Sequence, residues 1–276
     1  MIATPYRPGW DPAKGIAGIG AGLLVFGVAV PELRPAMAAL ISAGWLLLLL
    51  ARKRNMALAF AAVLPLAIVL VWPAVLGADA PMGDPACRDP FSVIAVRRLL
   101  VAVIGLAVVA LVARAMGTSR AELGLRRPTR LEAIVAVAGV LVLAVGGLVI
   151  GPAIAEPFFG KLDFPVPLAA IVPAVVFGIA NGTLEEVVYR GAMQTWLRPM
   201  MGTWVAILLQ GLVFGLVHAG PEVVTLLAVH VALLGTVGVL GGIARERLGS
   251  LWIPIGVHIG ADIALYVGLA CRAAAA

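Results

Sequence analysis

The sequence predicts an all-α protein, a polytopic transmembrane helical bundle of about eight to nine spans. Two observations are compositional: 62% of the residues are hydrophobic and 12% are charged, and the mean hydropathy is +1.09. Both values lie far from those of a soluble domain. The third observation is that apolar runs of roughly 16 to 22 residues recur along the chain, each about long enough to cross a bilayer core as a helix.

Nine apolar runs predict the membrane spans by the hydropathy criterion. In chain order they occupy residues 15–30, 36–51, 56–77, 99–116, 131–154, 168–197, 203–219, 222–244 and 251–270. Proline residues fall at or near the ends of many of these runs, where a missing N–H does least harm to a helix. The first run resembles a signal peptide, but Val30-Pro31-Glu32 is not a small-residue cleavage site, so we interpret the run as a first helix.

Basic residues predict the orientation. The net charge is +6, and most Lys and Arg residues lie in short segments between apolar runs, such as 52–54 and 114–130. Because cytoplasmic loops carry the excess of Lys and Arg, these segments share the cytoplasmic side if the N-terminus is cytoplasmic, with the protein in the cell inner membrane. The loop at 78–98, which contains Arg97 and Arg98, then faces outward. This pattern explains the positive charge without a nucleic-acid partner.

Ionisable residues inside the predicted spans cluster in the last third of the chain, and such residues are the natural candidates for function. Glu185, Glu186 and Arg190 lie together in the span at 168–197. Glu186 and Arg190 are four residues apart and share a helix face, with the acid on the N-terminal side, the better order for an ion pair. Glu185 points about 100° away around the same helix, so we do not expect it to pair with Arg190.

Two later spans carry histidines. His218 lies near the end of one span, and His258 precedes Asp262 by four residues in the last span. At 1.5 Å per residue, Glu185 lies ~18 Å, His218 ~24 Å and His258 ~14 Å above the nearest turn on one side of the membrane. These similar depths allow the three side chains to converge in one cavity. His230, in the span between, has a compatible depth but no further pattern, and we interpret it as structural or as a residue that supports the site from behind the other side chains.

These residue types suit hydrolysis. A carboxylate and an imidazole in one desolvated pocket can activate water, with the carboxylate as general base. Amide hydrolysis also needs donors for the oxyanion, which His258 with Asp262 behind it could supply or orient. Glu185, His218 and His258 also match the ligand set of a catalytic zinc with one open position. The residues leave both chemistries open, so the cofactor is either none or a divalent metal such as zinc.

The polar residues form a series of motifs. The series is Glu185-Glu186-x-x-x-Arg190, then Phe214-x-x-x-His218, then His258-x-x-x-Asp262. It resembles the motif series of the CAAX-protease and bacteriocin-processing family, which includes the Ras-converting CAAX endopeptidases. The resemblance covers roughly residues 165–270. It divides the chain into accessory N-terminal transmembrane helices at 1–130 and a CAAX-protease-like catalytic core at 131–276.

The resemblance implies an intramembrane protease with a glutamate-type mechanism. Glu185 would be the base, and His218 would help it to activate water. His258 would stabilise the oxyanion. Asp262 stands where the family motif accepts Asn or Asp, and because a carboxylate is a poor oxyanion donor, we expect it to orient His258 instead.

The resemblance also makes Glu186 and Arg190 supporting residues and implies a substrate with a membrane anchor. A prenylated C-terminal peptide, a leader peptide and a C-terminal anchor all fit. Two other classes stay open. A non-catalytic protein of the same fold, with an immunity or regulatory role, would more often have lost a motif. A proton-coupled transporter would be expected to show inverted repeats, which are not evident.

Overall fold

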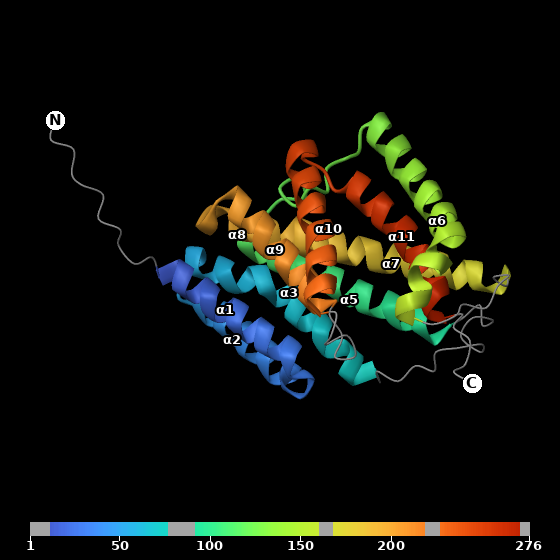
Figure 1. The fold of residues 1–276 in the computed structure, drawn as a ribbon. Helices are drawn as coiled ribbons and strands as arrows, with labels where there is room; N and C mark the ends of the chain where they lie inside the picture. Colours follow the sequence, from blue (N-terminus) through green and yellow to red (C-terminus); the bar gives the residue numbers. More distant parts are fainter. Residues whose placement is uncertain (1–11, 77–91, 160–167, 219–226, 271–276) are drawn as a thin grey trace.

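The structure, a computed structural model, describes residues 12–76, 92–159, 168–218 and 227–270, and over these ranges the chain forms helices and no strand (Figure 1). The α-helices in chain order are α1 (Pro12–Ala29), α2 (Arg34–Leu50), α3 (Arg54–Leu76), α5 (Val93–Met116), α6 (Arg130–Phe159), α7 (Ile171–Glu185), α8 (Gln194–Met201), α9 (Thr203–Val217), α10 (Leu227–Leu248) and α11 (Trp252–Ala270). Short 3-10 turns, η1 (Pro31–Leu33) and η2 (Leu168–Ala170), precede α2 and α7, and a π-helix, η3 (Glu186–Met193), joins α7 to α8.

Over the residues that the structure describes, each of the nine predicted spans coincides with helical structure, to within about two turns at each end. The prediction of an all-α helical bundle is confirmed. One boundary differs in a way that matters for function: α5 begins at Val93, so Arg97 and Arg98 lie inside this helix and not in a loop. The guanidinium of Arg98 contacts polar side chains of α7, which offsets the cost of a charge in an apolar helix. Residues 78–91 of the predicted outward loop lie outside the described residues.

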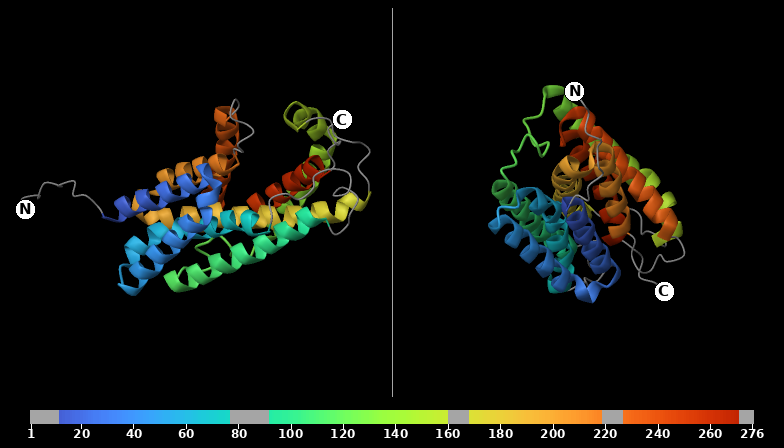
Figure 2. Two further views of the ribbon diagram at one scale, coloured as in Figure 1. Left: turned by 90° about the horizontal axis from the view of Figure 1, so that it is seen from below. Right: turned by 90° about the vertical axis from the view of Figure 1, so that its left-hand side faces the viewer.

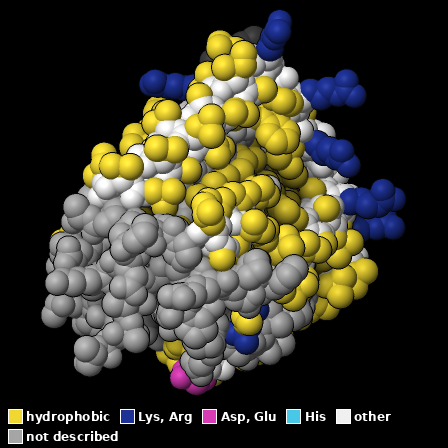
Figure 3. Space-filling view, turned by 90° about the vertical axis from the view of Figure 1, so that its right-hand side faces the viewer, with side chains coloured by type: hydrophobic (Ala, Val, Ile, Leu, Met, Phe, Trp, Pro, Cys, Tyr) yellow, Lys and Arg dark blue, Asp and Glu magenta, His cyan; other side chains and the backbone are white. Residues whose placement is uncertain are grey.

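Five helical segments in the described ranges are long and apolar enough to cross a membrane. They are Pro31–Leu50, Arg54–Val71, Val93–Met116, Arg130–Ile150 and Leu168–Met201, and two shorter apolar helices are Thr203–Val217 and Trp252–Val267. Figure 3 shows hydrophobic side chains spread over one face of the molecule, with Lys and Arg side chains projecting at its edges. An apolar surface with basic residues at its edges is typical of a membrane protein.

The rod formed by α7, η3 and α8 runs through the middle of the bundle (Figure 1). Helices α1, α2 and α3 pack together, and α5 packs against both α3 and α7. Helix α9 pairs with α10, while α11 packs against α6 and α7. In the left view of Figure 2, α6 and α10 lie on the side of α7 opposite to α5. The central rod is therefore the element that connects the N-terminal and C-terminal helices.

Glycines allow α11 to approach its neighbours closely, as small residues commonly do in membrane bundles. A Cβ atom added at Gly182 of α7 would lie 2.8 Å from the backbone nitrogen of Ile259 in α11. One added at Gly260 of α11 would lie 2.7 Å from the carbonyl oxygen of Val140 in α6. Backbone therefore contacts backbone on both sides of α11, which fixes this helix against α7.

The segment between α5 and α6 ties several helices together at one end of the bundle. Arg245 of α10 donates to the carbonyl oxygen of Glu122 at 2.5 Å. The indole of Trp252 in α11 donates to the carbonyl oxygen of Arg126 at 2.6 Å, and Arg126 donates to both carboxylate oxygens of Glu132 in α6 at 2.7 and 3.0 Å. The basic segment at 114–130, which is predicted to be cytoplasmic, is thus bonded to α6, α10 and α11.

Candidate active site

The junction of α7 and η3 carries two adjacent glutamates that face different partners. Helix α7 ends at Glu185, and the π-helical turns begin at Glu186, with every residue of η3 buried. A π turn holds more residues than an α turn and is frequently found at functional sites. Side chains after Glu185 are therefore rotated relative to the regular helix that the sequence predicts over 168–197.

The carboxylate of Glu185 is buried and has two different environments at its two oxygens. Oε1 accepts a hydrogen bond from Nη2 of Arg98 at 2.6 Å. Oε2 lies 3.4 Å from Nε2 of His218 and 3.5 Å from Nε2 of His258. Among the described residues, this second oxygen has no hydrogen-bond partner. It is the atom that is left to bind a water molecule or to accept a proton.

His218, at the end of α9, is held by its other ring nitrogen. Nδ1 lies 2.7 Å from the carbonyl oxygen of Phe214. A carbonyl can only accept, so Nδ1 carries the proton and Nε2 of the neutral ring is a free acceptor directed at Glu185. The ring also contacts the ring of Phe214, with centroids 4.4 Å apart. The spacing of four residues between Phe214 and His218 therefore positions the imidazole directly.

His258 of α11 is fixed in the same manner by Glu186. Its Nδ1 lies 2.8 Å from Oε1 of Glu186, and that carboxylate lies 3.1 Å from Nη1 of Arg190. Arg190 is itself fully enclosed, with its guanidinium 4.3 Å from the ring centroid of Phe214. As the spacing predicts, Arg190 pairs with Glu186 and not with Glu185. Nε2 of His258 is left facing Glu185.

Asp262 lies beside His258 and is held by a residue that the sequence analysis did not select. Oδ2 of Asp262 lies 3.6 Å from Nε2 of His258 and accepts a hydrogen bond from Nδ2 of Asn181 at 2.8 Å. Asn181 and Asp262 are both buried. Asp262 therefore lies within reach of His258, and its role as the group that orients this ring stays a prediction.

A cavity of about 620 Å³ adjoins these groups. Its polar part is formed by Glu186, Arg190, His218, His258 and Asp262, together with the ring of Phe214. The rest of its wall comes from apolar side chains of α10 and α11. The cavity is therefore apolar along most of its wall and ionisable at one end. Glu185 lies behind the two imidazoles, within reach of a molecule that hydrogen-bonds to their Nε2 atoms.

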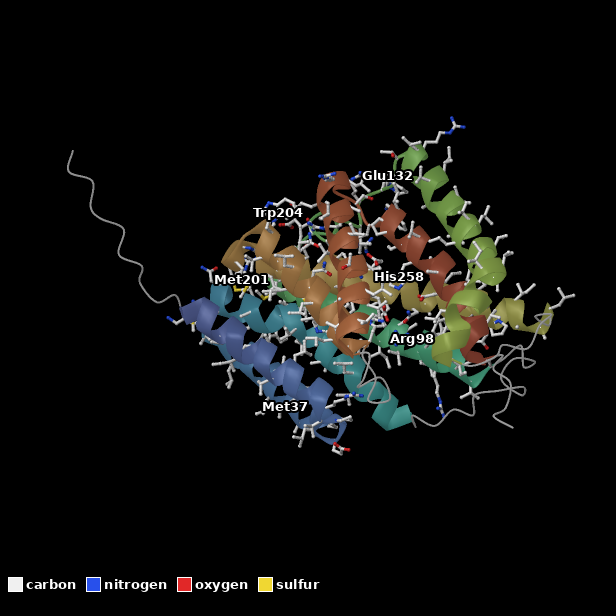
Figure 4. All side chains as sticks on the ribbon, in the orientation of Figure 1. Met37, Arg98, Glu132, Met201, Trp204 and His258 are labelled. Carbon is white, nitrogen blue, oxygen red and sulfur yellow. The ribbon has the colours of Figure 1, made fainter. Side chains whose placement is uncertain are left out.

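The structure brings together all six residues that the sequence singles out (Glu185, Glu186, Arg190, His218, His258 and Asp262). It adds Arg98 and Asn181, and the sequence contains a signal for each. Arg98 is a charged residue at the start of an apolar run, and Asn181 is an amide one turn before Glu185. Figure 4 shows the labelled Arg98 and His258 near the centre of the molecule. The side chain of His230 lies outside the described residues.

A metal ion at Glu185, His218 and His258 stays a prediction. Among the described residues, no group of three or more His, Cys, Asp and Glu side chains has an arrangement that could hold a metal. The guanidinium of Arg98 lies 2.6 Å from Oε1 of Glu185 and so places a positive charge beside this carboxylate, at the oxygen that does not face the imidazoles.

Comparison with known families identifies the part of the chain that carries these groups. Residues 167–264 match the model of a family described as type II CAAX prenyl endopeptidase Rce1-like. Comparisons with curated proteins and with solved structures gave no match. The matched region contains both glutamates, both site histidines and Asp262, and the family is one of membrane proteases. Residues 167–264 of this integral membrane protein are thus similar to the type II CAAX prenyl endopeptidases, which supports the resemblance to the CAAX-protease and bacteriocin-processing family.

Proposed function

We propose that the protein is an intramembrane endopeptidase that hydrolyses a peptide bond near the membrane surface with water activated by Glu185 and His218. One observation carries the proposal: Oε2 of Glu185 is buried, has no hydrogen-bond partner among the described residues, and faces Nε2 of two imidazoles whose Nδ1 atoms are already engaged. A base held between two aligned imidazoles in a desolvated site suits general base catalysis.

The proposed reaction uses water and the protein's own side chains. A water molecule on the cavity side hydrogen-bonds to Oε2 of Glu185 and Nε2 of His218. Its oxygen adds to the carbonyl carbon of the scissile peptide while Glu185 accepts the proton. The proton then passes to the leaving nitrogen as the C–N bond breaks, which gives a carboxylic acid and an amine. These roles follow the usual acid–base sequence of amide hydrolysis.

His258 is proposed to stabilise the oxyanion. When the ring is protonated, Nδ1 donates to Glu186 and Nε2 is free to donate to the carbonyl oxygen as negative charge develops. Asp262, whose Oδ2 lies 3.6 Å from Nε2, orients the imidazole ring for this role. Arg190 holds the Glu186 carboxylate in place. Glu186 and Arg190 are thus supporting groups in this proposal.

The cavity wall supports a substrate that carries a membrane anchor. Val237 and Leu240 of α10 and Val257 and Leu265 of α11 line the cavity and are also exposed on the outer surface. An apolar passage from the surface to the ionisable end suits an extended peptide attached to a lipid or to an apolar segment. Lipid-anchored peptides, leader peptides and C-terminal anchors belong to this class. Lipid and such a peptide or protein are the proposed partners, and nucleic acid is not.

The test compares the membrane-anchored proteomes of cells that express the wild type, Glu185→Ala or the control Glu32→Ala, a change at an exposed residue of η1. Precursors with an uncut terminus should accumulate with Glu185→Ala and with neither of the others. Expression and membrane insertion are checked for all three. Identical profiles for well-inserted proteins would contradict the protease and favour a non-catalytic membrane protein, and altered ion-coupled uptake would favour a transporter.

A further inference from the structure

Arg98 connects α5 to the proposed site from outside the region that matches the family model. It lies in α5 (Val93–Met116), whereas the match covers residues 167–264. Its side chain crosses to α7, where Nη2 donates to Oε1 of Glu185 at 2.6 Å and Nε donates to Oδ1 of Asn181. One guanidinium therefore binds two side chains that are one helical turn apart.

Asn181, which accepts from Arg98, also contacts a residue of α11 on the other side of the site. Its Nδ2 donates to Oδ2 of Asp262 at 2.8 Å, and that oxygen lies 3.6 Å from Nε2 of His258. Arginine can only donate and an ionised carboxylate can only accept, so the amide has one orientation that satisfies both neighbours. A chain of polar contacts thus runs from Arg98 through Asn181 and Asp262 to His258, and joins α5, α7 and α11.

We propose that Arg98 is a positioning residue of the hydrolytic site. It engages Oε1 of Glu185, which leaves Oε2 directed at the two imidazoles, and through Asn181 it sets Asp262 beside His258. The inference rests on the proposed function and extends it to a helix that the sequence analysis assigned to the accessory segment at 1–130. Glu185 and Glu186 then each have a guanidinium partner of their own, Arg98 and Arg190.

The chemistry requires an arginine and not any cation. The planar guanidinium has several N–H donors in a fixed fork, so one side chain reaches a carboxylate and an amide oxygen at the same time. A lysine would bring the charge but would not hold both acceptors in one geometry. The Arg98 side chain is 26% exposed, against 9% for that of Glu185, so a small cation from solution can reach the position of the guanidinium.

The experiment uses Arg98→Met and Arg98→Lys, with Arg114→Met as the control because Arg114 is an exposed residue of the same helix. Each full-length variant is first tested in cells for the precursors that accumulate with Glu185→Ala. The purified proteins are then assayed with a peptide that spans the cleavage site of such a precursor. We expect Arg98→Met to lower kcat about 10²-fold with little change in KM, as for a displaced catalytic group. The kcat of Arg98→Lys should lie between those of Arg98→Met and the wild type, and the kcat of Arg114→Met should equal that of the wild type.

Guanidinium ions separate positioning from a general structural role. At non-denaturing concentrations they should restore part of kcat to Arg98→Met and none to Glu185→Ala. The inference is overturned if Arg98→Met has the same kcat as the wild type. It is also overturned if guanidinium does not raise the low kcat of Arg98→Met and the kcat of Arg98→Lys is equally low. If Arg98→Met does not insert into the membrane, Arg98→Lys takes its place in the test, and a kcat of Arg98→Lys equal to that of the wild type overturns the inference.

The two proposals fail in different ways. If Glu185→Ala abolishes cleavage while the Arg98 variants cleave normally, the positioning role falls and the protease stands. If Glu185→Ala accumulates no precursor, the proposed function falls, and the role of Arg98 in it falls too.

Discussion

The pair formed by Glu186 and Arg190 is enclosed in the bundle, with 3% and 1% of the two residues exposed. Their closest polar atoms lie 3.1 Å apart, and the same carboxylate holds Nδ1 of His258. A buried pair is a weak argument for net stability, because both charges lose their hydration. Its contribution here is geometric: it fixes the carboxylate that fixes the imidazole.

Removal of one partner should nevertheless be costly. Arg190→Met leaves Glu186 buried without its guanidinium, and we expect the free energy of unfolding to fall by ~3–5 kcal/mol. The measurement is unfolding in detergent micelles. Arg198→Met is the control, because Arg198 pairs with Glu246 at 3.0 Å on the surface and an exposed pair contributes under ~1 kcal/mol. Equal losses for the two variants would show that the Glu186 charge is not enclosed as described.

At the scale of elements, the contact between α7 and α11 sets the distance between the glutamates and His258. Gly182 lies one turn before Glu185, and a Cβ there would be 2.8 Å from the backbone nitrogen of Ile259 and 3.1 Å from the carbonyl carbon of His258. Both neighbours are backbone atoms of α11, so they yield only if the helix moves. The close packing of α7 against α11 therefore sets the geometry of the site.

Gly182→Ala should displace α11 and lengthen the contacts of His258 with Glu185 and Glu186. We expect kcat to fall about 10²-fold, with ~1–3 kcal/mol lost from the free energy of unfolding through overpacking. Gly146→Ala, where an added Cβ meets no atom within 4 Å, is the matched control and should leave both quantities unchanged. The idea fails if the two alanine variants turn over substrate equally well.

The groove between α10 and α11 should determine access. Val237 lines the cavity and Val229 does not, although both are exposed residues of α10, at 49% and 59%. Val237→Trp should narrow the passage and lower kcat/KM roughly tenfold for an anchored peptide, equivalent to ~1.4 kcal/mol of binding. Val229→Trp should have no effect. A similar loss of kcat/KM in both variants would indicate a general disturbance of α10. If neither variant loses kcat/KM, the substrate reaches the site by another route.

The whole molecule has basic residues gathered at one end of an apolar bundle, where the segment between α5 and α6 is hydrogen-bonded to the end of α10 and the start of α11. The positive-inside tendency predicts that this end faces the cytoplasm. Together with an N-terminus on the same side, this is the orientation that we propose for the inner membrane.

Single cysteines test the orientation. In a chain with Cys87→Ser and Cys271→Ser, Arg120→Cys should react with a membrane-impermeant maleimide only after the membrane is opened, whereas Glu32→Cys should react in intact cells. Both positions are exposed and lie in turns between helices, so access to the thiol is matched. The reverse labelling pattern would invert the topology, and labelling of both in intact cells would contradict the helix count between them.

The sequence by itself determined the fold class, the positions of the helices and the six motif residues. The physical reason is local: in lipid every backbone polar group needs a partner within its own segment, so each long apolar run must be a helix. The spacing of Glu186 and Arg190 likewise predicts their pairing, because residues four apart lie on one face. The division of the chain at residue 130 stays a prediction.

Tertiary structure alone decided how the site is completed. Arg98 meets Asn181 and Glu185 across separations of 83 and 87 residues, and no periodicity within a helix encodes such a contact. The same contact allows Arg98 to lie inside α5: a hydropathy pattern counts Arg98 as a charge facing lipid, whereas the fold gives it a buried carboxylate as partner. The π-helix at Glu186–Met193 and the cavity between α10 and α11 also depend on packing between distant helices, which composition and spacing do not specify.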